Sequence, residues 1–186
     1  MLETKQLIEE LSQQATPLRP VPPRIWAARL LGVLGAYGAT MMLAMGTRAD
    51  IMLQLARPMF VLEIALLSGL LVSAALACIF AMYPDAYQRR SVLKLPYLLG
   101  SLMLALVVFQ LFTPQDPRMV MPDAHSHSIE CSLFIAMSAL LPSALIFMVL
   151  RKGATLMPFH AGALAVITSV AMGALALRLY EAIDAI

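Results

Sequence analysis

The sequence predicts an all-α membrane protein: a polytopic bundle of about five transmembrane helices, preceded by a short cytoplasmic helix. Two observations predict this class. Hydrophobic residues make up 61% of the chain and charged residues only 13%, and the apolar residues lie in long blocks, not at alternating or heptad spacing. Such blocks are typical of helices that cross a hydrocarbon core about 30 Å thick. The formal charge of +2 is too small to favour binding to nucleic acid.

A polar segment, residues 1–24, precedes the apolar blocks. Its first 15 residues fit a short amphipathic helix with Leu7, Ile8 and Leu11 on one face and acidic residues elsewhere. Membrane-surface helices usually carry Lys and Arg, so an acidic helix favours docking on a protein; a solvated, half-ordered tail stays the alternative. Four prolines between residues 17 and 23 predict an extended spacer. We find no apolar region typical of a cleavable signal peptide here, and expect the first span to direct insertion.

Residues 25–186 form the predicted transmembrane bundle. We place its five spans at about 26–46, 58–83, 96–113, 130–150 and 159–180. Trp26 and Arg29 suit the membrane interface at the start of the first span, whose small residues favour close helix packing. Residues 47–57 are expected to lie at the interface. Prolines between residues 114 and 128 predict a loop without regular helix.

Two residues inside the spans are candidates for coupling. Glu63 is an acid within the second span, where ionisable groups are by default functional, although this close to an interface it can also reach water. Pro142 removes a backbone hydrogen bond from the fourth span, which predicts a kink and a hinge. Arg151 and Gly153 form the basic turn that closes this span, and Gly153 suits a left-handed C-cap.

The basic residues predict how the spans are oriented, because cytoplasmic loops hold an excess of Lys and Arg. With five spans, nine basic residues fall on the side of the N-terminus: Lys5, Arg19, Arg24, Arg29, Arg89, Arg90, Lys94, Arg151 and Lys152. Four fall on the other side: Arg48, Arg57, Arg118 and Arg178. We therefore expect the N-terminus in the cytoplasm, and the start of the fourth span and the C-terminal tail outside.

A cluster of soft-metal ligands, His125, His127, Glu130 and Cys131, lies where the fourth span begins. If the helix already includes His127, this residue and Cys131 lie at i and i+4 on one face, a spacing that suits zinc or copper. A thiol near a helix N-terminus is also more reactive, because unpaired N–H groups favour the thiolate. The alternative is that the histidines are ordinary loop residues and that Cys131 is a small buried apolar group.

No nucleophile–base pair, phosphate loop or paired acid and base stands out in the sequence. We therefore predict that the protein is not an enzyme and has no resident cofactor. A metal ion enters this prediction only as a transient signal. Cys78 is expected in the inner half of the second span, far in depth from Cys131, so we do not expect an intramolecular disulfide.

Several short features follow one another along nearly the whole chain. They are the N-terminal helix with its spacer ending Pro22-Pro23, the Arg57-Pro58-Met59-Phe60 entry to the second span, Cys131, Pro142, and the group Arg151, Gly153, Ala154, Pro158, Ala161 and Gly162. In this order they resemble the NrsF family, bacterial inner-membrane negative regulators (anti-sigma factors) of an extracytoplasmic-function sigma factor of the SigF type.

The resemblance implies a multi-pass protein whose cytoplasmic N-terminal segment keeps the sigma factor from RNA polymerase until heavy-metal or oxidative stress releases it. It also implies two periplasm-facing cysteines as sensors. Cys131 matches the first, but where the second is expected, just after the fifth span, this chain has Tyr180-Glu181-Ala182. The family usually has a sixth span, whereas this sequence contains five, which fits either a five-span variant or an incomplete chain.

The leading hypothesis is therefore a membrane anti-sigma factor. Its predicted residues are Leu7, Ile8 and Leu11 for docking, Cys131 for sensing, and Glu63, Pro142, Arg151 and Gly153 for coupling. The expected partners are the sigma factor and the lipid bilayer, with no direct nucleic acid and with a homo-oligomer left open. One alternative is a small transport or metal-handling protein that uses Glu63 and the His125, His127 and Cys131 cluster. Another is a structural subunit of a larger complex, favoured by the Gly/Ala-rich first span.

Overall fold

The structure is a computed structural model that describes residues 22–46, 51–83, 90–112, 124–151 and 157–180. Within these residues the chain forms helices and no strands: α2 (Pro23–Met45), α3 (Ile51–Leu55), α4 (Pro58–Phe80), α5 (Arg90–Phe112), α6 (Ala124–Leu150) and α7 (Pro158–Tyr180). The all-α prediction is thus confirmed. The predicted N-terminal helix and its spacer up to residue 21 lie outside the described residues.

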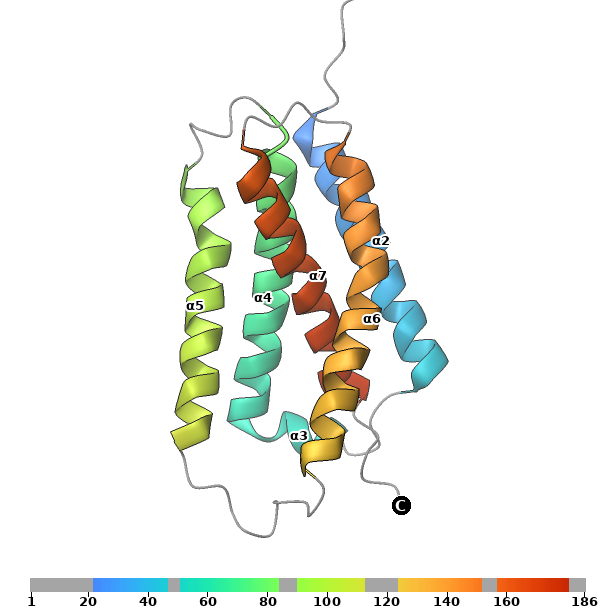
Figure 1. Cartoon of the computed structure of the whole chain (residues 1–186), viewed down its shortest axis with the longest axis vertical. Helices are drawn as coiled ribbons and strands as arrows, with labels where there is room; N and C mark the ends of the chain where they lie inside the picture. Colours follow the sequence, from blue (N-terminus) through green and yellow to red (C-terminus); the bar gives the residue numbers. More distant parts are fainter. Residues whose placement is uncertain (1–21, 47–50, 84–89, 113–123, 152–156, 181–186) are drawn as a thin grey trace, which may run out of the picture.

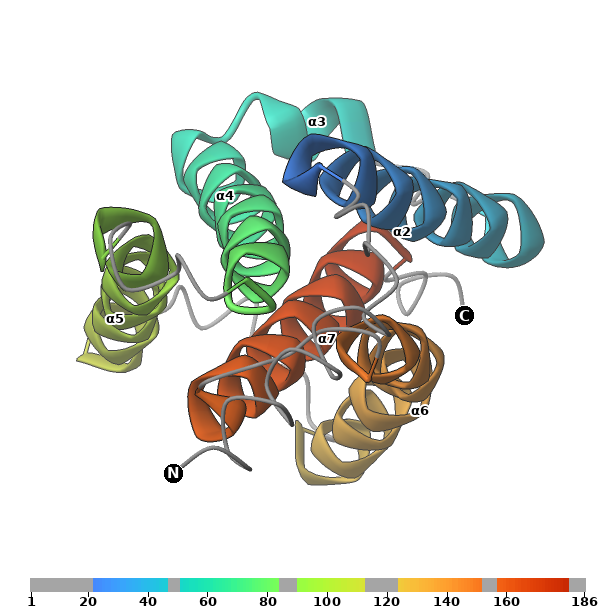
Figure 2. The same ribbon diagram turned by 90° about the horizontal axis from the view of Figure 1, so that it is seen from above.

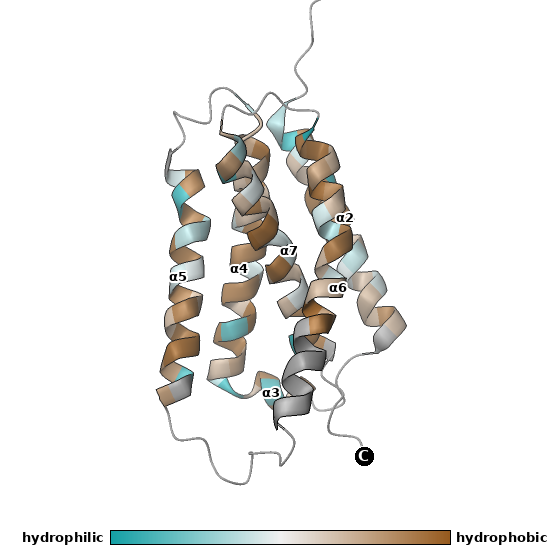
Figure 3. Cartoon of the chain, in the orientation of Figure 1, coloured by the Kyte–Doolittle hydropathy of each residue, from teal (hydrophilic) through white to brown (hydrophobic). Residues whose placement is uncertain are grey.

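Five of the helices, α2, α4, α5, α6 and α7, are long and apolar enough to cross a membrane, which agrees with the predicted number of spans. They run side by side (Figure 1), and apolar residues extend along most of their length (Figure 3). Large hydrophobic side chains are exposed on every one of them, including Leu43, Val61, Phe109, Phe147 and Val166. Such an exterior suits a bundle whose solvent is hydrocarbon.

The helix α7 is the centre of the bundle. It crosses the middle of the molecule when the bundle is seen from above, with α2, α4 and α6 around it (Figure 2), and it packs against all three. Its residues Leu164 and Thr168 are completely buried. The helix α5 lies further out and packs mainly against α4. The arrangement of α5 therefore depends on few neighbours.

The spans alternate in direction, so each end of the bundle collects a defined set of residues (Figure 1). One end holds the starts of α2, α5 and α7 and the ends of α4 and α6. Its described basic residues include Arg24, Arg29, Lys94 and Arg151, and we call it the basic end. The opposite end holds α3, the starts of α4 and α6, and the ends of α2, α5 and α7.

Close approaches between helices occur where glycine removes a side chain. A Cβ atom added at Gly173 in α7 would lie 2.9 Å from the backbone oxygen of Ile135 in α6. A Cβ at Gly38 in α2 would lie 2.8 Å from the terminal methyl of Met172 in α7. The small residues of the first span were expected to favour close packing, and Gly38 does so, whereas Gly32 and Gly35 face open space.

Two helices begin earlier than the sequence indicates. The helix α5 begins at Arg90, so Pro96 lies inside it and not in its first turn. One proline removes a single backbone hydrogen bond and need not end a helix whose neighbours support it. The helix α6 begins at Ala124, although a loop was expected up to residue 128. Its polar first turns lengthen the helix beyond its apolar span, which covers Leu133–Leu150.

Candidate functional site

A buried acid marks the opposite end of the bundle. Glu63 is the sixth residue of α4, which begins at Pro58, and only 5% of it is exposed. Proline suits the first position of a helix, because the N–H that it lacks would have no partner there. The start of α4 at Pro58 places Glu63 somewhat more than one turn inside the helix, on the side that α5 and α7 cover.

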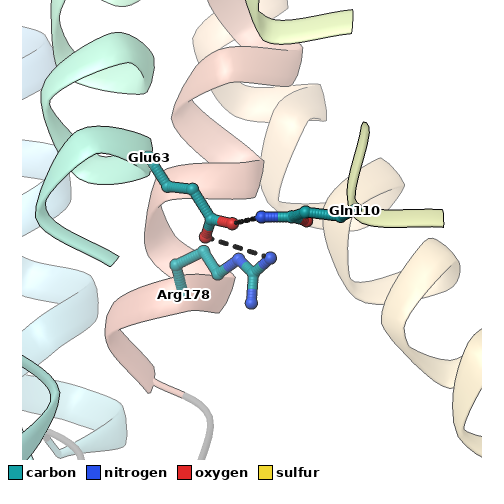
Figure 4. A network of polar contacts seen from close by, with 3 residues as sticks. All are labelled: Glu63, Gln110 and Arg178. Atoms are coloured by element: carbon teal, nitrogen blue, oxygen red, sulfur yellow. Dashed lines mark hydrogen bonds and ion pairs between the residues drawn. The ribbon is translucent and has the colours of Figure 1, made fainter. Parts of the chain in front are cut away.

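Two side chains from other helices meet the carboxylate of Glu63 (Figure 4). The side-chain amide of Gln110, near the end of α5, donates a hydrogen bond to Oε1 of Glu63. The guanidinium of Arg178, near the end of α7, lies 3.2 Å from Oε2. Each carboxylate oxygen thus has its own partner. We call Glu63, Gln110 and Arg178 the polar clamp.

The polar clamp makes a buried charge tolerable. A carboxylate taken out of water is costly unless a cation and hydrogen-bond donors replace the solvent, and Arg178 and Gln110 supply both. Arg178 is itself 41% exposed, so its charge can reach the edge of the bundle. The clamp joins α4, α5 and α7 at one level, and through Gln110 it ties the outer helix α5 to the central helices.

Glu63 was predicted as a candidate residue, but Gln110 and Arg178 were not. A signal for both was present in the sequence. Glu63 lies five residues after the start of its span, whereas Gln110 and Arg178 each lie two residues before the end of theirs. Because neighbouring spans alternate in direction, these three positions fall at the same side of a bilayer. Pairing an acid inside a span with polar residues at the same depth would have suggested the clamp.

Comparison with protein families decides what kind of protein carries this bundle. The family described as NrsF, negative regulator of sigma F, matches residues 11–186. The chain belongs to the NrsF family. Neither a curated protein nor a solved structure matches it. The suspected resemblance is confirmed, and the family description makes the chain a negative regulator whose partner is a sigma factor. The match contains the polar clamp, whereas of the predicted docking face it includes Leu11 but neither Leu7 nor Ile8.

The predicted sensor segment of this NrsF chain lies in the first turns of α6. The backbone is helical from Ala124, so His127 and Cys131 do occupy the i and i+4 positions of one helix. The side chains of residues 124–132 lie outside the description, as do Leu7, Ile8, Leu11 and Gly153. Metal binding by the cluster of His125, His127, Glu130 and Cys131 therefore stays a prediction.

The other predicted coupling residues lie in α6. Pro142 is completely buried within a helix that continues on both sides of it, and a hinge at this position stays a prediction. Arg151 is exposed just beyond the last turn, and its backbone N–H donates to the carbonyl of Phe147 at 3.0 Å. Arg151 therefore belongs to the basic end, as its place in the sequence indicates.

The second cysteine is buried at the basic end. Cys78 lies near the end of α4 with 1% of its surface exposed, and its sulfur is 3.9 Å from the carbonyl oxygen of Ala161 in α7. Cys131 belongs to the first turns of α6, at the opposite end of the bundle (Figure 1). A disulfide needs Cα atoms within about 7 Å, whereas these two residues belong to opposite ends of the bundle.

Proposed function

We propose that this NrsF protein holds an extracytoplasmic-function sigma factor at the bacterial inner membrane and releases it when metal or oxidative stress acts on the other side. The observation that carries the proposal is the family match over residues 11–186, on a chain with five helices able to cross a membrane. A regulator that binds a transcription factor needs no chemistry of its own, so we propose no enzymatic activity.

The N-terminal segment is the proposed docking element. It leads directly into α2, which begins at Pro23 at the basic end of the bundle. An excess of Lys and Arg is characteristic of cytoplasmic loops, so the orientation that we propose places this segment in the compartment of the sigma factor. The face formed by Leu7, Ile8 and Leu11 would cover apolar surface on the sigma factor and keep it from RNA polymerase.

The opposite end carries the proposed sensor. Cys131 precedes the apolar window Leu133–Leu150, so in this orientation it belongs to the outer side of the membrane. Because α6 begins at Ala124, Cys131 is its eighth residue and lies beyond the unpaired N–H groups of the first turn. The reactivity that we propose for its thiol therefore comes from His127, one turn earlier in the helix. A soft metal ion bound by the thiolate, with imidazole from His127 one turn away, or oxidation of the thiol, would then alter the start of α6.

The docking role is tested by substitutions on the two faces of the N-terminal segment. Leu7→Asp and Leu11→Asp place charge on the docking face, and Glu9→Gln, two residues from each of them, changes the other face as a control. The sigma factor is co-expressed with each full-length variant, and its membrane-bound fraction and the output of its promoter are measured. We expect the aspartates to weaken retention about tenfold or more, because each would bury an unpaired charge in an apolar interface and a tenfold change corresponds to only about 1.4 kcal/mol. We also expect promoter output to rise.

The control should retain the sigma factor as the unchanged chain does. Equal retention by the aspartate variants would remove the docking role from this face. Failure of the unchanged chain to retain any sigma factor would overturn the proposed function itself.

A further inference from the structure

The proline in α6 leaves one backbone carbonyl without its helical partner. Residue 142 would normally donate its N–H to the carbonyl oxygen four residues earlier, on Ser138, and proline has no N–H to donate. Pro142 is completely buried, and the site lies in the apolar part of the helix, Leu133–Leu150. An unpaired carbonyl at such a depth costs several kcal/mol. Another group must therefore supply the hydrogen bond.

That group comes from α2. The hydroxyl of Tyr37 donates to the carbonyl oxygen of Ser138 at 2.9 Å. Tyr37 is half-buried near the middle of α2, where its ring provides apolar surface and its hydroxyl reaches α6. The hydrogen bond that Pro142 cannot make inside α6 is thus made between two helices.

The central helix holds α6 at the same level. Gly173 of α7 lies so close that a Cβ atom there would be 2.8 Å from Oγ of Ser138 and 2.9 Å from the carbonyl oxygen of Ile135. The hydroxyl of Ser138 donates to that carbonyl at 3.1 Å. The backbone of α6 near Ser138 is therefore contacted both by α7 and by the hydroxyl of Tyr37.

This contact lies between the proposed sensor and the proposed docking element. Ser138 follows Cys131 by two helical turns in α6, and α2 continues toward the N-terminus into the docking segment. The geometry points to the Tyr37–Ser138 hydrogen bond as the link by which a change at the start of α6 is passed to α2. This inference rests on the proposed function and names its route of transmission.

The Tyr37–Ser138 hydrogen bond can couple α6 to α2 because an unpaired carbonyl inside the bundle is costly. A shift of α6 that moves Ser138 either carries Tyr37 with it or breaks the bond and leaves the buried carbonyl unpaired. The two arrangements differ in free energy, which is the condition for coupling between sites. Tyr37 is in this view a positioning residue: it acts on the docking segment through α2.

The hydrogen bond is tested first without the sigma factor, by a double-mutant cycle. Tyr37→Phe removes only the hydroxyl, and Pro142→Ala restores the backbone N–H that serves Ser138 within α6. The thermal midpoint of the purified full chain is measured in detergent. We expect Tyr37→Phe to lower the midpoint by about 3 °C in the natural background and to change it little in the Pro142→Ala background. Equal shifts in both backgrounds would overturn the assignment of the hydroxyl to this carbonyl.

The coupling is then tested in cells that carry the sigma factor and its promoter reporter. Copper ions or hydrogen peroxide serve as the signal, and Tyr97→Phe in the outer helix α5 is the matched control. We expect the Tyr37→Phe protein to retain the sigma factor without stress but to give a response about fivefold smaller, while Tyr97→Phe responds normally. A normal response from Tyr37→Phe overturns this inference. Absence of retention and response in the unchanged protein overturns the proposed function instead.

Discussion

Glu63 and Arg178 depend on each other unequally. The side chain of Glu63 is 6% exposed and that of Arg178 is 41% exposed. Without Arg178 the carboxylate would stay in apolar surroundings with Gln110 as its remaining clamp partner, and an uncompensated buried charge is costly. Without Glu63 the guanidinium, near the last turn of α7, can extend toward water along its apolar stem. The cation is therefore more important for stability than the anion.

This inequality predicts the effect of removing each partner. Arg178→Met should lower the free energy of unfolding by about 3 kcal/mol. Glu63→Gln should lower it by about 1 kcal/mol, because glutamine keeps an acceptor oxygen for Gln110. Denaturant unfolding of the purified chain in mild detergent measures both. The double variant should recover part of the loss caused by Arg178→Met, since no unpaired ion remains. Equal losses in the two single variants would refute the inequality.

At the scale of the elements, α7 has the most demanding packing. It lies between α2, α4 and α6 (Figure 2), and at Gly173 its backbone approaches α6 so closely that no side chain fits. Helices in lipid gain little from the hydrophobic effect between them, so close backbone packing is a main source of their association. A glycine at such a contact sets the distance between two helices.

Gly173→Ala should therefore destabilise the bundle by about 2 kcal/mol, the cost of an overpacked core, because the backbone oxygen of Ile135 cannot move aside easily. Gly162→Ala in the same helix is the control, because no atom lies within 4 Å of its added Cβ. Alanine there should increase the stability of the bundle by at most about 1 kcal/mol through its higher helix propensity. Gly38→Ala should cost less than Gly173→Ala, since its close neighbour is the flexible end of Met172. Thermal melting of the three variants tests this order. Equal losses of melting temperature in Gly173→Ala and Gly162→Ala would contradict it.

The spans were predictable from sequence because each needs its own block of apolar residues, and all five blocks became helices. The first residues of α5 and α6 could not be predicted in this way. Hydropathy locates the part of a helix that lies inside hydrocarbon, whereas a helix can begin several residues before that part. Polar residues such as His125 and His127 do not interrupt a helix. A proline such as Pro96 interrupts it only where the freed carbonyl finds no support.

The depth of a polar residue in its span could be read from the sequence, but the faces on which distant helices meet could not. Tyr37 and Ser138 are 101 residues apart, and Glu63 and Gln110 are 47 apart. Composition and periodicity carry no information about which faces of distant helices meet. The sequence did indicate which groups need a partner. These are the carboxylate of an acid inside a span and the carbonyl that a proline inside a span leaves unpaired. The structure supplies the partners from α5, α7 and α2.

On the scale of the whole molecule, the two ends of the bundle carry different functional groups. The basic end carries the link from α2 to the N-terminal segment, whereas the opposite end carries the polar clamp and the first turns of α6 (Figure 1). The proposed response to a signal from outside needs this separation, with α6 and α2 spanning the distance. The proposed orientation places the start of α6 outside the cell membrane.

The orientation can be checked with the natural cysteines, because the chain has only two. A membrane-impermeant thiol reagent added to intact spheroplasts should label the protein through Cys131, which precedes the apolar window of α6. Labelling should disappear in Cys131→Ser and persist in Cys78→Ser, because Cys78 is 1% exposed and lies toward the other end of the bundle. Cys131→Ser should also blunt the response to copper or peroxide, while Cys78→Ser keeps it. Labelling that requires lysis of the cells would reverse the orientation, and an unchanged dose response in Cys131→Ser would remove this thiol from the sensing mechanism.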